Sequence, residues 1–167
     1  MIAMMIAIVG SSAGSFVADD AKEKKNSGKI DVRLATVAEL EKHVAAQKGK
    51  PTAMDVWATW CVPCREKFPK FVALAGKHKE KARFFSLSID EEEQLGDAKK
   101  FLELSKATFA NFLAKDGAEA IEKKFGFEGV PQYVLWDEGG KIVLRTNDIV
   151  KFEEKLKELL TAKKGDA

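Results

Sequence analysis

Short apolar segments typical of β-strands alternate along this chain with segments that have the 3.6-residue period of amphipathic helices. The strands are predicted at residues 29–34, 52–58, 83–89, 109–113, 132–137 and 141–146. The helices are predicted at residues 36–48, 62–78, 94–105, 118–125 and 149–162. Strands that alternate with helices are typical of an α/β sheet flanked by helices. The turn at residues 138–140 (EGG) predicts an antiparallel hairpin, so we expect a mixed sheet.

Composition limits the class of protein further. The chain has 167 residues, 46% hydrophobic and 32% charged, which is typical of a globular protein with one domain. Its formal net charge of +2 is too small to indicate a nucleic acid or an anionic membrane as partner. We find no internal repeat and expect a monomer. Two cysteines cannot form a disulfide-rich scaffold or an all-cysteine zinc site.

The first 18 residues differ from the rest because they carry no charged side chain. Residues 2–9 form an apolar run and residues 10–15 are small and polar, an order typical of a secretory signal peptide. A membrane span needs about 20 apolar residues, so this run is short for one. No Lys or Arg precedes the run, and an uncleaved anchor or a cytoplasmic tail stay as alternatives.

We therefore predict four segments along the chain. They are a signal peptide at 1–18, a polar linker at 19–29, one domain at 30–162 and a C-terminal tail at 163–167. The leader predicts an extracytoplasmic protein, either periplasmic or secreted, with a membrane tether at the N-terminus as a further option.

Cys61 and Cys64 lie where a predicted strand ends and a predicted helix begins. Their spacing places both sulfurs on the first helical turn, where free N–H groups and the positive end of the helix dipole stabilise a thiolate. Pro63 fits this turn because a proline there loses no hydrogen bond, and Arg65 adds positive charge. The pattern favours a redox pair with Cys61 as the nucleophile and Cys64 as the resolving thiol.

Alternative roles of the cysteine pair fit the sequence less well. A haem attachment site needs a His after the second Cys, where this chain has Arg65. A zinc site needs more ligands, and His43 and His78 lack finger spacing and are expected on the surface. A structural disulfide across so short a loop would constrain the unfolded chain little. A non-enzymatic module that binds copper through the two thiols also stays open.

Residues 55–65 (DVWATWCVPCR) resemble the active-site segment of the thioredoxin superfamily. Pro69 matches the proline inside that family's active-site helix, and residues 129–131 (GVP) resemble the loop that carries its cis-proline. The motif is most similar to exported TlpA/ResA-like thiol-disulfide oxidoreductases. The resemblance covers residues 30–162 and implies a thioredoxin-like fold. It also implies an inserted helix and strand between residues 90 and 129, before the cis-proline.

The resemblance implies roles for residues around the cysteines. Asp55 would lie beneath them, and burial would raise its pKa and make it a proton acceptor for Cys64. An exposed Asp at a strand end is the alternative.

Substrate would be bound by five residues, namely Trp60, Val62, Pro63, Val130 and Pro131. A cis Pro131 would present the Val130 backbone to an extended peptide, whereas an ordinary trans turn proline is the alternative. Trp57 is expected to pack in the core.

The implied function is an exported protein-disulfide reductase that uses only the Cys61–Cys64 disulfide and no other cofactor. Strong oxidants of the superfamily usually carry His between the cysteines, whereas this chain has Val62 and Pro63, which favours a reductant. The implied partners are a client protein of the cytochrome c maturation or copper-site assembly type and a membrane protein that donates electrons. A general disulfide oxidant or isomerase is the alternative.

Overall fold

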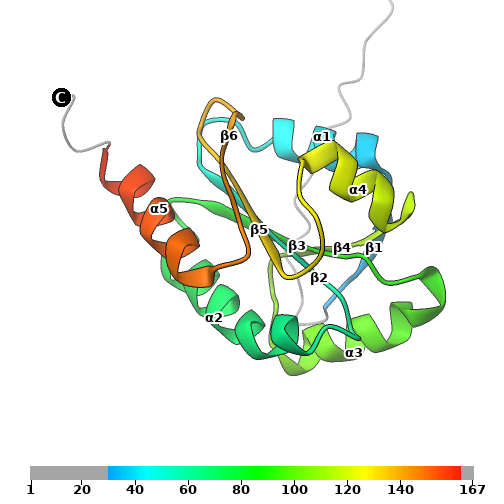
Figure 1. Cartoon of the computed structure of the whole chain (residues 1–167). Helices are drawn as coiled ribbons and strands as arrows, with labels where there is room; N and C mark the ends of the chain where they lie inside the picture. Colours follow the sequence, from blue (N-terminus) through cyan, green and yellow to red (C-terminus); the bar gives the residue numbers. More distant parts are fainter. Residues whose placement is uncertain (1–29, 163–167) are drawn as a thin grey trace, which may run out of the picture.

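The computed structural model describes residues 30–162 (Figure 1). Its strands are β1 (Arg33–Ala35), β2 (Thr52–Trp57), β3 (Arg83–Ser88), β4 (Ala110–Ala114), β5 (Gln132–Trp136) and β6 (Ile142–Thr146). Its helices are α1 (Val37–Ala45), α2 (Val62–His78), α3 (Leu95–Leu104), α4 (Gly117–Phe125) and α5 (Ile149–Ala162), with a short 3₁₀ helix η1 (Glu92–Gln94) before α3. The predicted signal peptide, linker and C-terminal tail lie outside the described residues.

The six strands form one mixed sheet in the order β1-β4-β3-β2-β5-β6. The first four strands of this order are parallel to one another, and β5 and β6 are antiparallel to their neighbours. Helices α1 and α4 cover one face of the sheet, while α2, α3 and α5 cover the other (Figure 1). This arrangement confirms the predicted α/β fold and the antiparallel hairpin.

The segment between β3 and residue 131 contains η1, α3, β4 and α4. Strand β4 lies between β3 and β1 and is parallel to both. The predicted insert of a helix and a strand is therefore present, and the strand predicted at residues 109–113 is β4.

Helix α1 begins with a capping box. The Glu39 N–H donates to Thr36 Oγ1 at 3.3 Å, and Glu39 Oε2 accepts from the Thr36 N–H at 2.8 Å. These bonds satisfy two donors that a helix N-terminus leaves free. The helix ends at Ala45, three residues before the predicted end.

Aromatic side chains fill the core on both faces of the sheet. On the face covered by α2, the buried Trp57 ring lies 5.4 Å from the Phe68 ring and 4.8 Å from the Phe101 ring. The core position predicted for Trp57 is confirmed.

His43 contradicts the prediction that it is a surface residue. Its ring lies half-buried on the other face of the sheet, edge-on to Phe85 and Phe112 at 5.0 and 4.9 Å. Burial and the nearby charge of Arg33 lower the pKa of His43 to about 4. The ring thus packs as part of the core.

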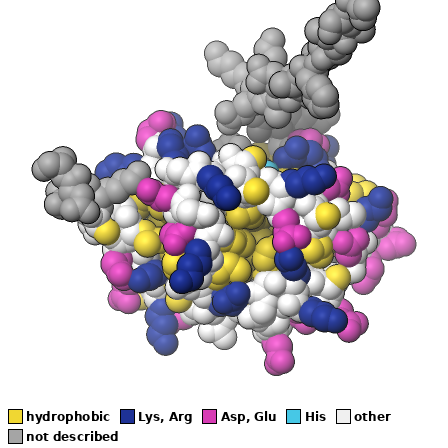
Figure 2. Space-filling view, turned by 90° about the horizontal axis from the view of Figure 1, so that it is seen from above, with side chains coloured by type: hydrophobic (Ala, Val, Ile, Leu, Met, Phe, Trp, Pro, Cys, Tyr) yellow, Lys and Arg dark blue, Asp and Glu magenta, His cyan; other side chains and the backbone are white. Residues whose placement is uncertain are grey.

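Charged side chains are distributed without separation by sign on the face shown in Figure 2. Lys and Arg alternate there with Asp and Glu around a strip of exposed hydrophobic side chains. This face therefore has no extended patch of one charge.

Within residues 30–162, no helix combines the length and the apolar character that crossing a membrane requires.

Candidate active site

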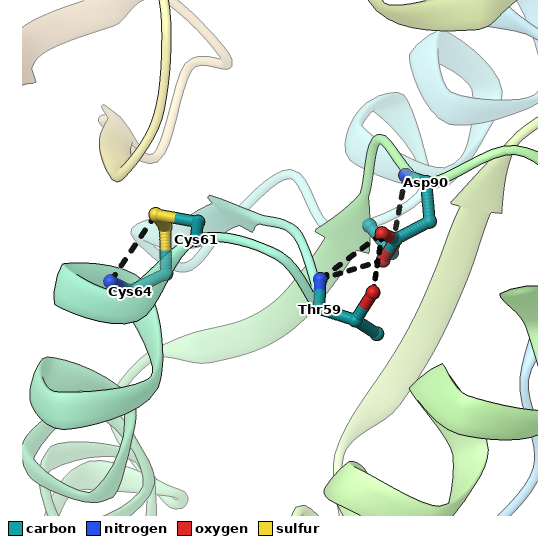
Figure 3. Close-up of a disulfide and its surroundings, with 5 residues drawn as sticks. Thr59, Cys61, Cys64 and Asp90 are labelled. Carbon is teal, nitrogen blue, oxygen red and sulfur yellow. Dashed lines mark hydrogen bonds between the residues drawn. A yellow bond between two sulfur atoms is a disulfide. The ribbon is translucent and has the colours of Figure 1, made fainter.

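Cys61 and Cys64 form a disulfide at the N-terminus of α2, with their Cα atoms 5.3 Å apart (Figure 3). Cys61 is the N-cap residue, and its Sγ accepts from the Cys64 N–H at 3.3 Å. A helix N-terminus presents free N–H groups and positive potential to this sulfur. Cys61 is slightly more exposed than Cys64 (5% against 2%). The geometry therefore suits attack by Cys61 on an external sulfur and a return attack by Cys64.

The local sequence explains why the helix begins here. The Cys61 N–H donates to the Ala58 carbonyl at 3.1 Å, which closes the turn after β2. The Arg65 N–H donates to the Cys61 carbonyl at 3.2 Å and starts the helical pattern. Pro63 lies in this first turn, where its missing N–H costs no hydrogen bond.

Asp55 lies in the middle of β2 and is only 1% exposed, which excludes an exposed strand end. Alternate residues of a strand share a face, so Asp55 points to the same side as Trp57, which packs against α2. Its Oδ1 has no hydrogen-bond partner within the described part of the chain. Burial alone raises the pKa of this carboxyl well above its ordinary value.

Tyr133 is a second buried polar group on this face. It lies directly opposite Asp55 in the β2–β5 register, and its hydroxyl also lacks a partner among the described residues. Burial, followed by the nearby charges of Asp55 and Asp148, raises the pKa of Tyr133. Two buried polar groups, Asp55 and Tyr133, thus lie opposite each other on neighbouring strands.

Three of the predicted substrate-binding residues surround the disulfide on the outside. Trp60 and Val62 flank Cys61 in the chain and are 63% and 54% exposed, and Pro63 is exposed as well. Large exposed apolar side chains next to a reactive group are suited to contact another molecule.

The other two predicted residues lie at the same end of the sheet. The Val130–Pro131 peptide bond is cis, as the sequence resemblance implied. Gln132 pairs with Val56, so Val130 and Pro131 lie beside the end of β2, where the chain turns toward the cysteines. Val130 is half-buried and Pro131 is buried.

Thr59 and Asp90 form a contact that the sequence analysis missed. The Asp90 carboxylate accepts from the Thr59 N–H at 3.0 and 2.9 Å and from the Thr59 hydroxyl at 2.7 Å (Figure 3). Each residue follows a predicted strand, and parallel neighbouring strands bring their carboxyl ends together at one edge of the sheet. This placement was the signal in the sequence that would have indicated the contact.

Among residues 30–162, no group of three or more His, Cys, Asp or Glu side chains is arranged to hold a metal ion.

Comparisons with known proteins agree with this description. A Redoxin family model matches residues 12–161. The thiol-disulfide oxidoreductase ResA of Bacillus thuringiensis (strain Al Hakam) is 32% identical over 135 residues, which are 81% of this chain and 67% of that protein. The thiol:disulfide interchange protein CycY of Rhizobium leguminosarum bv. viciae is 33% identical over 102 residues, which are 60% of this chain and 52% of that protein.

Solved structures show the same similarity. A protein from Chlorobium tepidum assigned as thiol:disulfide interchange protein DsbE superimposes with a TM-score of 0.62 at 28% identity, over 70% of this chain and 84% of that chain. The family model spans most of the sequence, and these relatives are named for the chemistry that a Cys-x-x-Cys pair performs. The chain therefore belongs to the Redoxin family and is a thiol-disulfide oxidoreductase with the thioredoxin-like fold and the redox pair Cys61–Cys64.

Proposed function

We propose that this oxidoreductase is exported and reduces disulfides in a few client proteins. The observation that carries the direction of electron flow is the pair of residues between the cysteines. A strong oxidant is one whose reduced form is stabilised, and this needs groups that hold the Cys61 thiolate. Val62 and Pro63 offer no side-chain hydrogen bond and no charge to that thiolate. The disulfide is therefore favoured over the dithiol, which makes the dithiol a reductant.

In the proposed reaction, the Cys61 thiolate attacks one sulfur of the client disulfide. The client S–S bond breaks, a mixed disulfide forms, and one client thiolate leaves. Cys64 then gives its proton to the Asp55 carboxylate and attacks Cys61 Sγ. The second client thiolate leaves, and the Cys61–Cys64 disulfide is formed. Two electrons pass from the enzyme dithiol to the client, and a membrane protein restores the dithiol.

The exposed apolar residues at the disulfide would contact the client. Trp60, Val62 and Pro63 offer a surface beside Cys61, and the backbone of Val130 next to Pro131 would pair with an extended client segment in the manner of a β-strand. The same geometry would bring a client disulfide to the Cys61 sulfur.

The proposed clients are cysteine pairs of apocytochrome c or of copper sites, reduced outside the cytoplasm. Similarity to ResA and CycY supports this class of client. The uncharged apolar leader at residues 1–18 supports export, either with cleavage or with a tether to the membrane. We propose that the enzyme acts as a monomer.

A trapping experiment tests this function. The Cys64→Ser variant, reduced and mixed with an oxidised Cys-x-x-Cys-His peptide, should accumulate a mixed disulfide through Cys61 that is visible by mass spectrometry. The Cys61→Ser variant is the matched control and should trap far less. Reduction of the peptide by wild type should exceed reduction of insulin in kcat/KM. Net oxidation of the reduced peptide by the wild-type disulfide would contradict the proposal.

A further inference from the structure

Asp90 lies two residues after the end of β3 and is 3% exposed. Besides its bonds from Thr59, its Oδ2 accepts from the Ser88 hydroxyl at 2.5 Å, and its own N–H donates to Ser88 Oγ at 3.1 Å. Every contact of the carboxylate oxygens is thus with a donor. The Asp90 side chain thus receives hydrogen bonds both from the loop after β2 and from the end of β3.

The Thr59 end of this contact is close to the reacting sulfur in the chain. Thr59 lies two residues before Cys61 and directly before Trp60. The β2–β3 hydrogen bonds end with the Ile89 N–H donating to the Trp57 carbonyl at 2.9 Å. Beyond that point the loop leaves the sheet, and the Thr59–Asp90 bonds continue the connection to the β3 side (Figure 3).

We propose that Asp90 is a positioning residue for disulfide exchange, which acts through Thr59 to hold Trp60 and Cys61 in place at the N-terminus of α2. Three short bonds to one residue restrict both its backbone and its side chain. Because Thr59 directly precedes Trp60 and lies two residues before Cys61, holding its backbone limits the positions that the nucleophile can take. Productive attack requires the sulfur atoms to be aligned, so loss of the restriction lowers the rate of exchange.

The charge of Asp90 adds a second effect, which rests on the proposed function as a reductant. A negative charge on Asp90, bonded to the loop that leads into Cys61, would disfavour formation of a negative thiolate on Cys61. It therefore favours the disulfide over the dithiol and makes the dithiol more reducing. Neutralising Asp90 should shift the equilibrium with glutathione toward the enzyme dithiol.

Ser88 supplies the matched control for a purely structural role. It bonds to the same carboxylate but belongs to β3, where it pairs with Trp57 and not with Thr59. Ser88→Ala removes one hydrogen bond to Asp90 while both kinds of bond from Thr59 stay. If Asp90 acts only on stability, Ser88→Ala and Thr59→Val should behave alike.

The experiment compares Asp90→Asn, Thr59→Val, Thr59→Ser and Ser88→Ala in the full chain. We expect Thr59→Val to lower kcat/KM for insulin reduction about tenfold, as for loss of one hydrogen bond to a charged group. Asp90→Asn should lower it at least as much, and Thr59→Ser should restore it to nearly wild type. The double variant Asp90→Asn/Thr59→Val should lose no more than Asp90→Asn alone, because both changes break the same link.

Reduction potentials separate the effect of the Asp90 charge from the effect of the Thr59–Asp90 hydrogen bonds. Asp90→Asn should shift the equilibrium constant with glutathione several-fold toward the dithiol, where tenfold corresponds to about 30 mV. Ser88→Ala should change neither rate nor potential. Equal rate losses in Ser88→Ala and Thr59→Val, or unchanged rates in both Thr59→Val and Asp90→Asn, would overturn the proposal. If Asp90→Asn does not fold, the comparison of Thr59→Val with Thr59→Ser still tests the proposal. A wild-type enzyme that proves to be an oxidant would contradict the proposed function. The rates of the variants relative to wild type would still test the positioning role of Asp90.

Discussion

Replacing Asp55 with Asn is expected to change how the stability of the oxidised protein depends on pH. Asp55 is 1% exposed and its Oδ1 has no partner in the described chain, so the folded protein disfavours its charged form. Burial raises its pKa well above the ordinary value of 3.8. In the unfolded chain the same carboxyl loses its proton near the ordinary value. Between the two pKa values, the folded protein therefore binds one proton more than the unfolded protein.

The magnitude follows from this difference of one proton. The contribution of Asp55 to the free energy of unfolding should fall by about 1.4 kcal/mol for each pH unit in that window. The contribution of Asp55 to the free energy of unfolding is at its maximum below the ordinary pKa of 3.8. It decreases as the pH rises toward the pKa of Asp55 in the folded protein. Asn does not titrate, so the stability of Asp55→Asn relative to wild type should increase with pH at this slope. The gain should level off once the folded carboxyl has ionised.

Chemical denaturation of the oxidised proteins between pH 4 and 8 at constant ionic strength measures this slope. The disulfide does not titrate, so the cysteines do not contribute to the result. Asp31→Asn, which changes an exposed carboxylate, is the matched control. A difference between Asp55→Asn and wild type that is constant with pH, or that decreases as the pH rises, would refute the reasoning. If the new Asn makes poor hydrogen bonds, the stability of Asp55→Asn shifts by the same amount at every pH, and the slope with pH is unaffected.

Three further predictions concern other parts of the molecule. His43 has its pKa lowered to about 4, so it binds fewer protons in the folded state. The contribution of His43 to the free energy of unfolding should decrease as the pH falls from about 6.5 toward 4, so the stability of wild type relative to His43→Gln should decrease over this range in denaturation curves; a difference that stays constant would contradict it. Leu102→Ala should lower the free energy of unfolding by about 2–5 kcal/mol, because Leu102 is fully buried in α3. A change below about 1 kcal/mol would contradict this prediction and show that the core around residue 102 repacks without leaving a cavity. Trp60→Ala should change stability by less than about 0.5 kcal/mol but raise KM for a client peptide, and an unchanged KM would remove Trp60 from the binding surface.

Local patterns in the sequence predicted most of the fold. Periodicity placed the five α-helices and the six strands within a few residues, because amphipathic helices and apolar strands each repeat at their own spacing, but it did not predict the 3₁₀ helix η1. The strand at residues 109–113 had the weakest pattern, since it is short and contains Asn111. It forms because β4 pairs on both sides and Asn111 satisfies its side chain with Ser86 and with two backbone carbonyls.

What the sequence analysis did not predict depends on register between distant segments. Thr59 and Asp90 are 31 residues apart and meet only because β2 and β3 are parallel neighbours. Tyr133 lies opposite Asp55 only through the antiparallel pairing of β2 and β5. His43 was expected on the surface because the sequence shows no partner for it, whereas two rings from other strands lie against it in the fold.

The reduction potential of the Cys61–Cys64 pair tests the central claim most directly. Equilibration of the full chain with glutathione of known ratios, read by mass spectrometry after alkylation, gives this potential. With no donor at Val62 or Pro63 to hold the Cys61 thiolate, we predict a potential much nearer the about −270 mV of thioredoxin than the about −120 mV of DsbA. A potential close to that of DsbA would contradict the assignment of this protein as a reductant.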